Sequence, residues 1–166
     1  MKINIIAAVG RNLELGKDNE LIWHIDEDLK YFKEMTIGKT VVMGENTYYS
    51  IGKALPCRDN VVLSFNRKNI PGVLVLNNYK DVFKLNCDEV FIIGGASIYD
   101  LFLPYSDNLY LTEIDDEDSS CDCYFPFFDK SLYDKTIIRE GESSDIKYLF
   151  VCYSRKEKVL WMENLL

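Results

Sequence analysis

The sequence predicts an α/β fold built on a largely parallel sheet, and two patterns along the chain support this. Short apolar runs rich in Ile and Val recur, mostly without polar interruption, as in strands that are covered on both faces. Segments with helical spacing lie between these runs, and this alternation is typical of a parallel sheet flanked by helices. The C-terminal third has strand-like segments with no helical spacer between the last two, so we expect the sheet to end antiparallel.

The elements follow in order along the chain. Apolar runs predict strands over residues 3–9, 40–43, 60–64, 73–76, 90–93, 109–114, 135–139 and 147–154. Helical spacing predicts helices over residues 26–35, 46–51, 80–85 and 97–102. With 166 residues, of which 48% are apolar, the chain can bury the core of a single domain. We expect that domain to span residues 1–155, with residues 156–166 as a C-terminal tail of unknown role.

Composition excludes several classes of protein. The formal net charge is -8 and no basic face is visible, which argues against nucleic-acid binding. The five cysteines show no repeated paired spacing and are interpreted as reduced thiols; with His24 as the one histidine, we expect no metal site. The acidic run over residues 115–118 lacks the ligand spacing of a calcium site and is interpreted as a solvated loop. No apolar run approaches a membrane span, so we expect a soluble, cytoplasmic protein that does not bind membranes.

Asp28 is the most informative single residue. In the first predicted helix Ile25, Leu29, Phe32 and Met35 share one face, and Asp28 lies near the edge of that face. A carboxylate on a buried face has a raised pKa and tends to belong to a functional site. In the first turn it would also favour the helix dipole from solvent. Position alone leaves both interpretations open.

Two junctions lead from a buried strand through glycine into a helix. Gly44 follows the apolar run that ends at Met43, and Gly94 and Gly95 follow the run that ends at Ile93. Glycine lets a ligand approach the backbone, and the free amides of a helix N-terminus favour an anion. Two such junctions suit a pyrophosphate, although the G-x-G-x-x-G fingerprint is absent. Each junction alone is explained by an ordinary turn, whereas the pair together with Asp28 favours a ligand.

A set of short motifs occurs in a fixed order along the chain. The motifs are Ile6-Ala7-Ala8, Gly16-Lys17-Asp18-Asn19, Trp23, Asp28-Leu29-x-x-Phe32, Val42-Met43-Gly44-x-x-Thr47, Ser50-Ile51-Gly52, Leu55-Pro56-x-Arg58-x-Asn60, Ile93-Gly94-Gly95, Tyr99, Phe102-Leu103-Pro104, Leu109-Tyr110-Leu111-Thr112 and Phe125-Pro126. Each motif is weak alone. The ordered set is highly specific, and it resembles the dihydrofolate reductase family from the first strand to about Arg155.

The resemblance implies a mainly parallel eight-stranded central sheet with an antiparallel C-terminal strand, flanked by four helices. It implies an enzyme that transfers a hydride from NADPH to 7,8-dihydrofolate, giving 5,6,7,8-tetrahydrofolate for one-carbon metabolism. It also implies binding of antifolate inhibitors and a monomeric state.

The resemblance assigns catalytic roles to Asp28, Trp23 and Thr112. Asp28 would hold the pterin ring and promote protonation of N5, Thr112 would support that carboxylate, and Trp23 would help to order water near the ring. Arg58 would bind the carboxylate of the substrate's glutamate tail through paired hydrogen bonds, a task suited to a guanidinium group. The substrate-binding residues implied are Ile6, Ala7, Asp28, Leu29, Phe32, Ile51, Leu55, Arg58, Ile93 and Thr112.

The resemblance also implies an NADPH site. The loop over residues 9–24 would close over the nicotinamide, and Tyr99 would lie beside it. The pyrophosphate would lie against Gly44 and the Gly94-Gly95 pair, which the family usually joins by a cis peptide. The cofactor-binding residues implied are Ala8, Leu15, Gly16, Gly44, Asn46, Thr47, Leu63, Ser64, Arg67, Lys68, Ile93, Gly94, Gly95, Ala96, Ser97, Ile98 and Tyr99.

The chain departs from the family pattern where the 2′-phosphate of NADPH would bind. Glu45 follows the first glycine junction, where the family commonly has a basic residue, and Ser97 stands where some members carry arginine. An acid opposes phosphate binding. We therefore hypothesise that Arg67 and Lys68 supply the missing charge, with a weaker preference for NADPH over NADH.

Two further departures lie in loops. Ile22 replaces the proline that usually precedes Trp23, and loss of that φ restraint should leave the loop more mobile. Cys121 replaces a glycine in the loop that supports the closed state of the family.

Two other functions stay open on the sequence. The related riboflavin-pathway reductase shares the sheet and the glycine junction but lacks the set formed by Trp23, Asp28 and Arg58. A non-catalytic folate or dinucleotide-binding protein is made plausible by Glu45 and Ile22 alone. Loss of NADPH absorbance on addition of dihydrofolate distinguishes a reductase from a binding protein.

Overall fold

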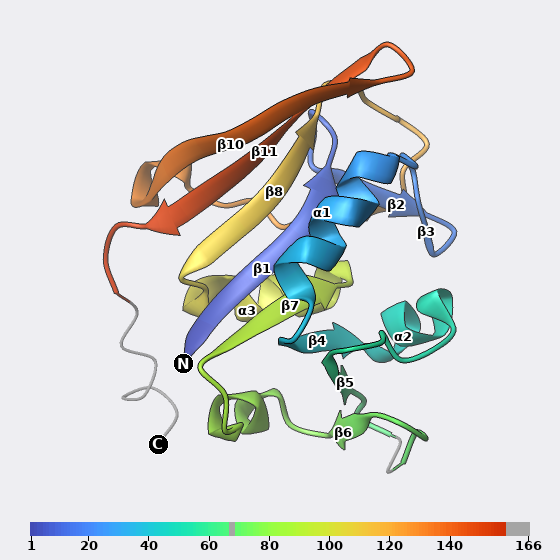
Figure 1. The fold of residues 1–166 in the computed structure, drawn as a ribbon, viewed down its shortest axis with the longest axis vertical. Coiled ribbons are helices and arrows are strands. Elements are labelled where there is room, and N and C mark those ends of the chain that lie inside the picture. The colour runs from blue at the N-terminus through green and yellow to red at the C-terminus, as the bar shows by residue number, and fades with distance from the viewer. Residues whose placement is uncertain (67–68, 159–166) are drawn as a thin grey trace.

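A central eight-stranded sheet organises the computed structural model, which describes residues 1–66 and 69–158. The strands run in the order β10-β11-β8-β1-β7-β4-β5-β6 (Figure 1). Their bounds are β1 (Lys2–Val9), β4 (Thr40–Gly44), β5 (Asp59–Leu63), β6 (Leu74–Leu76), β7 (Glu89–Gly94), β8 (Asn108–Ile114), β10 (Tyr133–Ser143) and β11 (Ile146–Arg155). All neighbouring strands pair parallel except β11, which is antiparallel to both β8 and β10. The predicted fold class and the antiparallel C-terminal end are confirmed.

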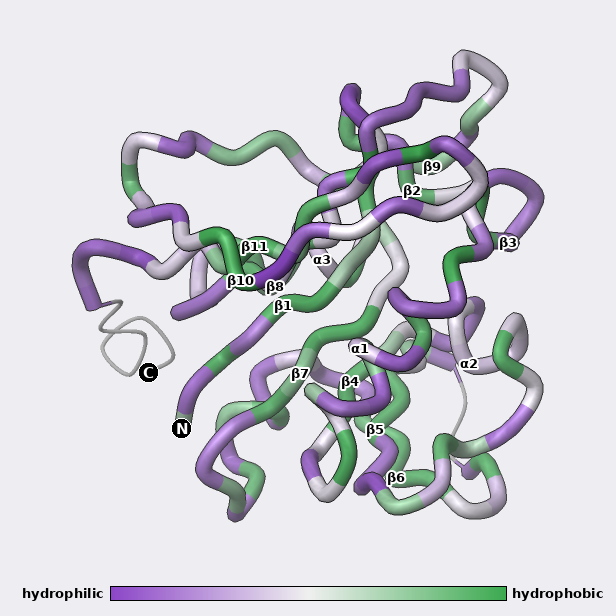
Figure 2. Tube along the Cα trace, turned by 45° about the horizontal axis from the view of Figure 1, so that its top comes forward, coloured by the Kyte–Doolittle hydropathy of each residue, from purple (hydrophilic) through white to green (hydrophobic). Residues whose placement is uncertain are grey.

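Helices cover both faces of this sheet because its central strands are apolar on both sides. Helix α1 (Asp26–Thr36) crosses one face and α3 (Ala96–Phe102) lies on the other, while α2 (Glu45–Ile51) follows β4 (Figure 1). Side chains alternate along β1: Ile5 joins the core beneath α3, and Ile6 joins the core beneath α1. Figure 2 shows the apolar residues concentrated along β7 at the centre of the sheet.

Helix α1 has clear start and stop signals. The acidic residues Asp26, Glu27 and Asp28 fill its first turn, where they favour the positive end of the helix dipole. Gly38, with φ +72°, follows its C-cap and takes a left-handed conformation that a residue with a side chain rarely adopts. The first turn of α1 contacts β8, because Asp28 meets Thr112 there.

The helix predicted over residues 80–85 is present, but it is a 3₁₀ helix and not an α-helix. Residues Tyr79–Lys84 form a 3₁₀ helix, η1, whose start is capped by Asn78, because its side chain accepts a hydrogen bond from the Lys80 amide. A segment of six residues shows too few turns for helical spacing to distinguish the two helix types.

A small second sheet was missed. It comprises β2 (Glu14–Lys17), β3 (Glu20–Leu21) and β9 (Cys123–Tyr124), in the order β3-β2-β9. Strands of two to four residues carry no alternation that a sequence reading detects. Two further 3₁₀ turns, η2 (Leu103–Tyr105) and η3 (Lys130–Leu132), complete the described elements. No helix of the described residues is long and apolar enough to cross a membrane.

Residues 67–68 and 159–166 lie outside the described residues, so the roles predicted for Arg67 and Lys68 and most of the predicted tail fall there.

Candidate active site

A carboxylate and a hydroxyl meet where α1 packs against β8. The Thr112 hydroxyl, 2% exposed, donates a hydrogen bond to Oδ1 of Asp28 at 2.5 Å. Burial raises the pKa of the Asp28 carboxyl, and the hydrogen bond from Thr112 acts in the opposite direction. Asp28 therefore faces the sheet, and the interpretation of a fully solvated first-turn acid is wrong.

Apolar side chains from several elements surround this pair. Ile6 of β1 and Ile93 of β7 are buried in the core beneath α1, and Phe32 and Leu55 pack against the same core. Two predicted members of the substrate site are more exposed. Leu29 is 51% exposed and Ile51 is 37% exposed. Exposed apolar side chains next to a buried carboxylate suit a flat ligand with one polar edge.

Asn60 holds the backbone of the loop that carries Arg58. The Asn60 side chain accepts a hydrogen bond from the Leu55 amide at 2.8 Å and donates to the carbonyls of Leu55 at 2.9 Å and Arg58 at 3.0 Å. Cζ of Arg58 lies 5.8 Å from the ring centre of Phe32. Among the described residues its buried Nε has no hydrogen-bond partner, which is costly for a cation unless a ligand supplies an acceptor. The clamping role of Asn60 could not be predicted from the sequence pattern.

The segment after β1 is tied down by the acidic run that follows β8. The Trp23 indole donates to Oδ2 of Asp116 at 2.9 Å, and Arg11 Nε pairs with Asp115 at 2.7 Å. The Asp18 amide donates to the Asp122 carboxylate at 3.0 Å. Residues 115–118 form a loop of exposed and half-buried residues, in agreement with the interpretation as a solvated loop. Charge composition could not show that this loop also contacts the segment after β1.

The indole N–H of Trp23 has a protein acceptor in this structure. An indole ring has one N–H donor, and in this structure Asp116 accepts it. The ring packs against the core beneath α1 through its carbon atoms. Cys121 is buried in the same region, and its thiol contacts the carbonyl of Gly16 at 3.2 Å.

The two glycine junctions lie side by side, because β4 and β7 are neighbours. A Cβ atom added at Gly44 would lie 2.9 Å from Cγ1 of Ile98, and one added at Gly95 would lie 3.5 Å from Oγ1 of Thr47. The peptide between Gly94 and Gly95 is cis, as the resemblance implied. Neither α2 nor α3 has a side-chain cap, so both helix starts leave backbone amides for a ligand.

Tyr99 and Ser64 are two buried residues of the predicted cofactor site. The Tyr99 hydroxyl is buried and donates to the Ile6 carbonyl at 2.8 Å, and burial raises its pKa. The Ser64 hydroxyl, 3% exposed, donates to Oε2 of Glu45 at 2.7 Å, and Asn77 donates to the Ser64 carbonyl. Glu45 is thus bound by the residue that directly follows β5.

The other predicted residues fall into three groups. Leu15, Leu63 and Ile98 are buried, Ala7, Ala8, Gly16 and Ala96 are half-buried, and Asn46 and Ser97 are exposed at the starts of α2 and α3.

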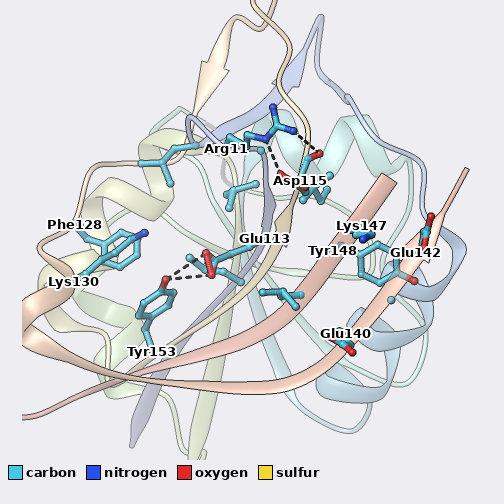
Figure 3. A pocket seen from close by; sticks show the side chains of 17 residues that line it. Arg11, Glu113, Asp115, Phe128, Lys130, Glu140, Glu142, Lys147, Tyr148 and Tyr153 are labelled. Atoms are coloured by element: carbon cyan, nitrogen blue, oxygen red, sulfur yellow. Dashed lines mark hydrogen bonds and ion pairs between the residues drawn. The ribbon is translucent and has the colours of Figure 1, made fainter. Parts of the chain in front are cut away.

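Two hollows lie away from the Asp28 pair. The larger, about 740 Å³, is lined by Leu111 and Glu113 of β8, and Glu113 points toward Tyr153 (Figure 3). None of the predicted site residues lines this hollow. The second, about 670 Å³, includes Arg58 and continues past β5.

Comparisons with known proteins agree with this arrangement. A family model described as dihydrofolate reductase matches residues 2–155. The chain is 39% identical to a dihydrofolate reductase of Bacillus subtilis over 93% of this chain and 95% of that protein. It is 41% identical to a dihydrofolate reductase type 3 of Salmonella typhimurium over 92% and 94%. A solved dihydrofolate reductase from Enterococcus faecalis, in complex with NADP(H) and an inhibitor named RAB-propyl, superposes with a TM-score of 0.86 at 29% identity, over 94% of this chain and 97% of that one.

Proposed function

This chain belongs to the dihydrofolate reductase family, and from that membership we propose that Asp28 anchors and activates the substrate. The chain transfers a hydride from NADPH to 7,8-dihydrofolate and forms 5,6,7,8-tetrahydrofolate. The observation that carries the assignment is the Asp28 carboxylate, which lies beside the apolar residues beneath α1 and is paired with a buried hydroxyl.

The raised pKa of Asp28 suits its proposed task. The ionised form accepts hydrogen bonds from the pterin ring nitrogen and 2-amino group, so it orients the ring against Phe32 and Ile6. The protonated form supplies the acid that the reaction needs when the substrate nitrogen N5 takes up a proton. Thr112 holds the carboxylate at Oδ1, which leaves Oδ2 for the ligand.

We assign the substrate's glutamate tail to Arg58. Its unpartnered buried Nε, beside the ring of Phe32, suits a carboxylate that accepts two parallel hydrogen bonds. Leu29, Ile51 and Leu55 would cover the benzoyl part of the same ligand, which explains why two of these apolar side chains stay exposed here.

The residues around the glycine junctions fit NADPH. The absence of side chains at Gly44 and Gly95 keeps the two uncapped helix starts close together, as a pyrophosphate requires. When bound, NADPH supplies the hydride. Tyr99 contributes by fixing α3 to β1 through its bond to Ile6, and the loop held by Asp116 and Asp122 excludes water from the nicotinamide side.

Glu45 supports a reduced preference for NADPH over NADH. Its carboxylate lies at the first position of α2, bound by Ser64, near the expected site of the 2′-phosphate. We propose that basic residues Arg67 and Lys68 offset this charge. Steady-state kinetics with NADPH and NADH test this proposal. They compare the native chain with an Arg67→Ala, Lys68→Ala double variant, and an unchanged affinity of the variant for NADPH would contradict the proposal.

The wider assignments are a cytoplasmic monomer with one domain over residues 1–155 that binds antifolate inhibitors. Sedimentation of the purified chain tests the monomer, and inhibition by a diaminopyrimidine tests the last point.

The decisive experiment follows NADPH absorbance after addition of dihydrofolate. The native chain should consume NADPH, and Asp28→Asn should lose about a hundredfold or more of the hydride-transfer rate near neutral pH while still folding. An Asp28→Asn variant with native activity would remove the central assignment.

A further inference from the structure

The Tyr31 hydroxyl is a buried polar group that the reaction described above does not use. Tyr31 belongs to α1 and is 5% exposed. Among the described residues its Oη has no hydrogen-bond partner. A buried hydroxyl without a partner is costly, and such groups in native proteins commonly hold a buried water that has two to four polar partners.

Tyr31 packs directly beside the pair that holds the catalytic carboxylate. Its ring lies 4.3 Å, centre to centre, from the ring of Phe150 on β11. Phe150 is the cross-strand partner of Thr112, the residue that donates to Asp28. Tyr31 also lies one turn after Asp28 on α1, and residues three apart lie on the same side of a helix. Helix and sheet thus bring Tyr31 next to the Asp28 and Thr112 side chains.

Polar groups from each neighbouring element face the Tyr31 side chain. Tyr110 of β8 and Cys152 of β11 are cross-strand partners on the next rung of the sheet. Arg139 of β10 lies with Cζ 5.7 Å from the Tyr31 ring centre, and Asp28 faces it from α1 itself.

These surroundings keep the Tyr31 hydroxyl protonated. Burial is the largest cause that raises the pKa of Tyr31, which reaches about 12. The neighbouring groups Tyr110, Cys152 and Asp28 raise this pKa further, and the positive charge of Arg139 lowers it. Burial likewise raises the pKa of Tyr110 to about 12. Both hydroxyls therefore stay protonated over the working range of an enzyme, and the Tyr110 hydroxyl has the Cys152 thiol as a hydrogen-bond partner.

We propose that the Tyr31 hydroxyl is a positioning group for Asp28: with Tyr110, it holds one water beneath α1 that donates a hydrogen bond toward the Asp28 and Thr112 pair. The donated bond favours the ionised carboxylate, which is the form that orients the pterin. The inference rests on the role of Asp28 proposed above. It adds a group that sets the pH at which Asp28 takes up the proton for N5.

The variant Tyr31→Phe removes only the oxygen from a ring that keeps its packing on Phe150. A lost donor raises the pKa of a carboxyl. Hydride transfer needs protonated Asp28. In Tyr31→Phe the midpoint of the profile of hydride-transfer rate against pH should therefore move up by about half a pH unit to one pH unit. Above the midpoint, Tyr31→Phe should then be about threefold to tenfold faster than the native chain. A packing defect would slow the reaction at every pH and leave the midpoint in place.

Matched variants separate the possible outcomes. Tyr148→Phe alters the other tyrosine that packs on Phe150, with ring centres 5.4 Å apart, and should leave the midpoint unchanged. Tyr110→Phe should move the midpoint upward as Tyr31→Phe does, and it carries the test if Tyr31→Phe does not fold. Single-turnover hydride transfer, started with saturating NADPH and dihydrofolate, is the measurement.

The Asp28→Asn background distinguishes this inference from the proposed function. If Asp28→Asn lowers activity as expected and Tyr31→Phe leaves the native midpoint unmoved or lowers it, the Tyr31 inference is overturned and the role of Asp28 stands. If Asp28→Asn keeps the native profile, the role of Asp28 fails, and the Tyr31 inference fails with it.

Discussion

At the residue scale, the burial that suits Asp28 to its proposed chemical role also lowers the stability of the folded protein. Its folded-state pKa is raised by burial, so the folded protein binds this proton more tightly than the unfolded chain does. The associated penalty is absent below the ordinary carboxyl range, grows as pH rises, and is complete above the folded-state pKa. Asp28→Asn removes the charge and keeps an acceptor for Thr112.

We therefore predict that Asp28→Asn increases the free energy of unfolding at neutral pH while it lowers activity. The gain should shrink as pH falls below the range in which Asp28 is ionised. Urea unfolding of both proteins at several pH values measures it, with Asp26→Asn, an exposed acid of the same turn, as the control. A variant that is less stable than the native chain at neutral pH would contradict the burial argument.

Arg58 allows a second prediction at this scale. Arg58→Lys keeps the positive charge but loses the fork that binds a carboxylate twice, so KM for dihydrofolate should rise by about tenfold to a hundredfold with little change in kcat. Dihydropteroate lacks the glutamate tail, and its KM should be the same for both proteins. An equal loss with both substrates would show that Arg58 acts on the pterin end or on the fold.

At the element scale, the acidic segment after β8 acts as the support of the loop before α1. The Asp116 carboxylate accepts a hydrogen bond from the Trp23 indole N–H, and the Asp116 backbone carbonyl accepts one from the Arg11 amide at 2.9 Å. The Asp118 carboxylate accepts a hydrogen bond from the Ser120 amide within its own turn. The hydrogen bond from Trp23 is the largest influence that lowers the pKa of Asp116, so the interaction persists to low pH.

Asp116→Ala should free the Trp23 ring and slow hydride transfer on the order of tenfold, because the loop no longer excludes water from the reacting atoms. Asp118→Ala removes a nearby acid whose carboxylate is hydrogen-bonded to Ser120 within its own turn, and it should react at close to the native rate. Stopped-flow single turnovers measure both. Equal effects from the two substitutions would indicate a general effect of loop charge.

Elements also differ in how well the sequence predicted them. Most of the long strands and α1 were predicted closely because several turns or a continuous apolar run repeat the same signal. Strand β10 was predicted over residues 135–139 but extends over Tyr133–Ser143, because most of its residues are exposed and carry no continuous apolar run. The short strands β2, β3 and β9 were missed, since their position depends on contacts with distant segments such as the pairing of Gly16 with Cys123. The same limit applies to the site. Asp28 could be found from its place in a pattern, but the Asp116 acceptor and the Asn60 clamp arise only when remote segments meet.

At the scale of the whole molecule, the net charge bears on how ligands reach the site. The formal charge is -8, and both substrates of the reaction, NADPH and dihydrofolate, are anions. Long-range repulsion slows the encounter of like charges, and salt screens it over about 10 Å at 0.1 M.

We accordingly predict that the association rate constants for NADPH and dihydrofolate increase about twofold to threefold when salt rises from about 0.02 M to about 0.2 M. Dihydropteroate, with fewer carboxylates, should show a weaker dependence, which separates screening of the ligand's charge from a change in the protein. Stopped-flow binding at constant pH and viscosity is the measurement. A rate constant that falls with salt would contradict this prediction, because salt would then be screening an attraction. In that case local cations such as Arg58 would outweigh the net negative charge at the distance where ligands are captured.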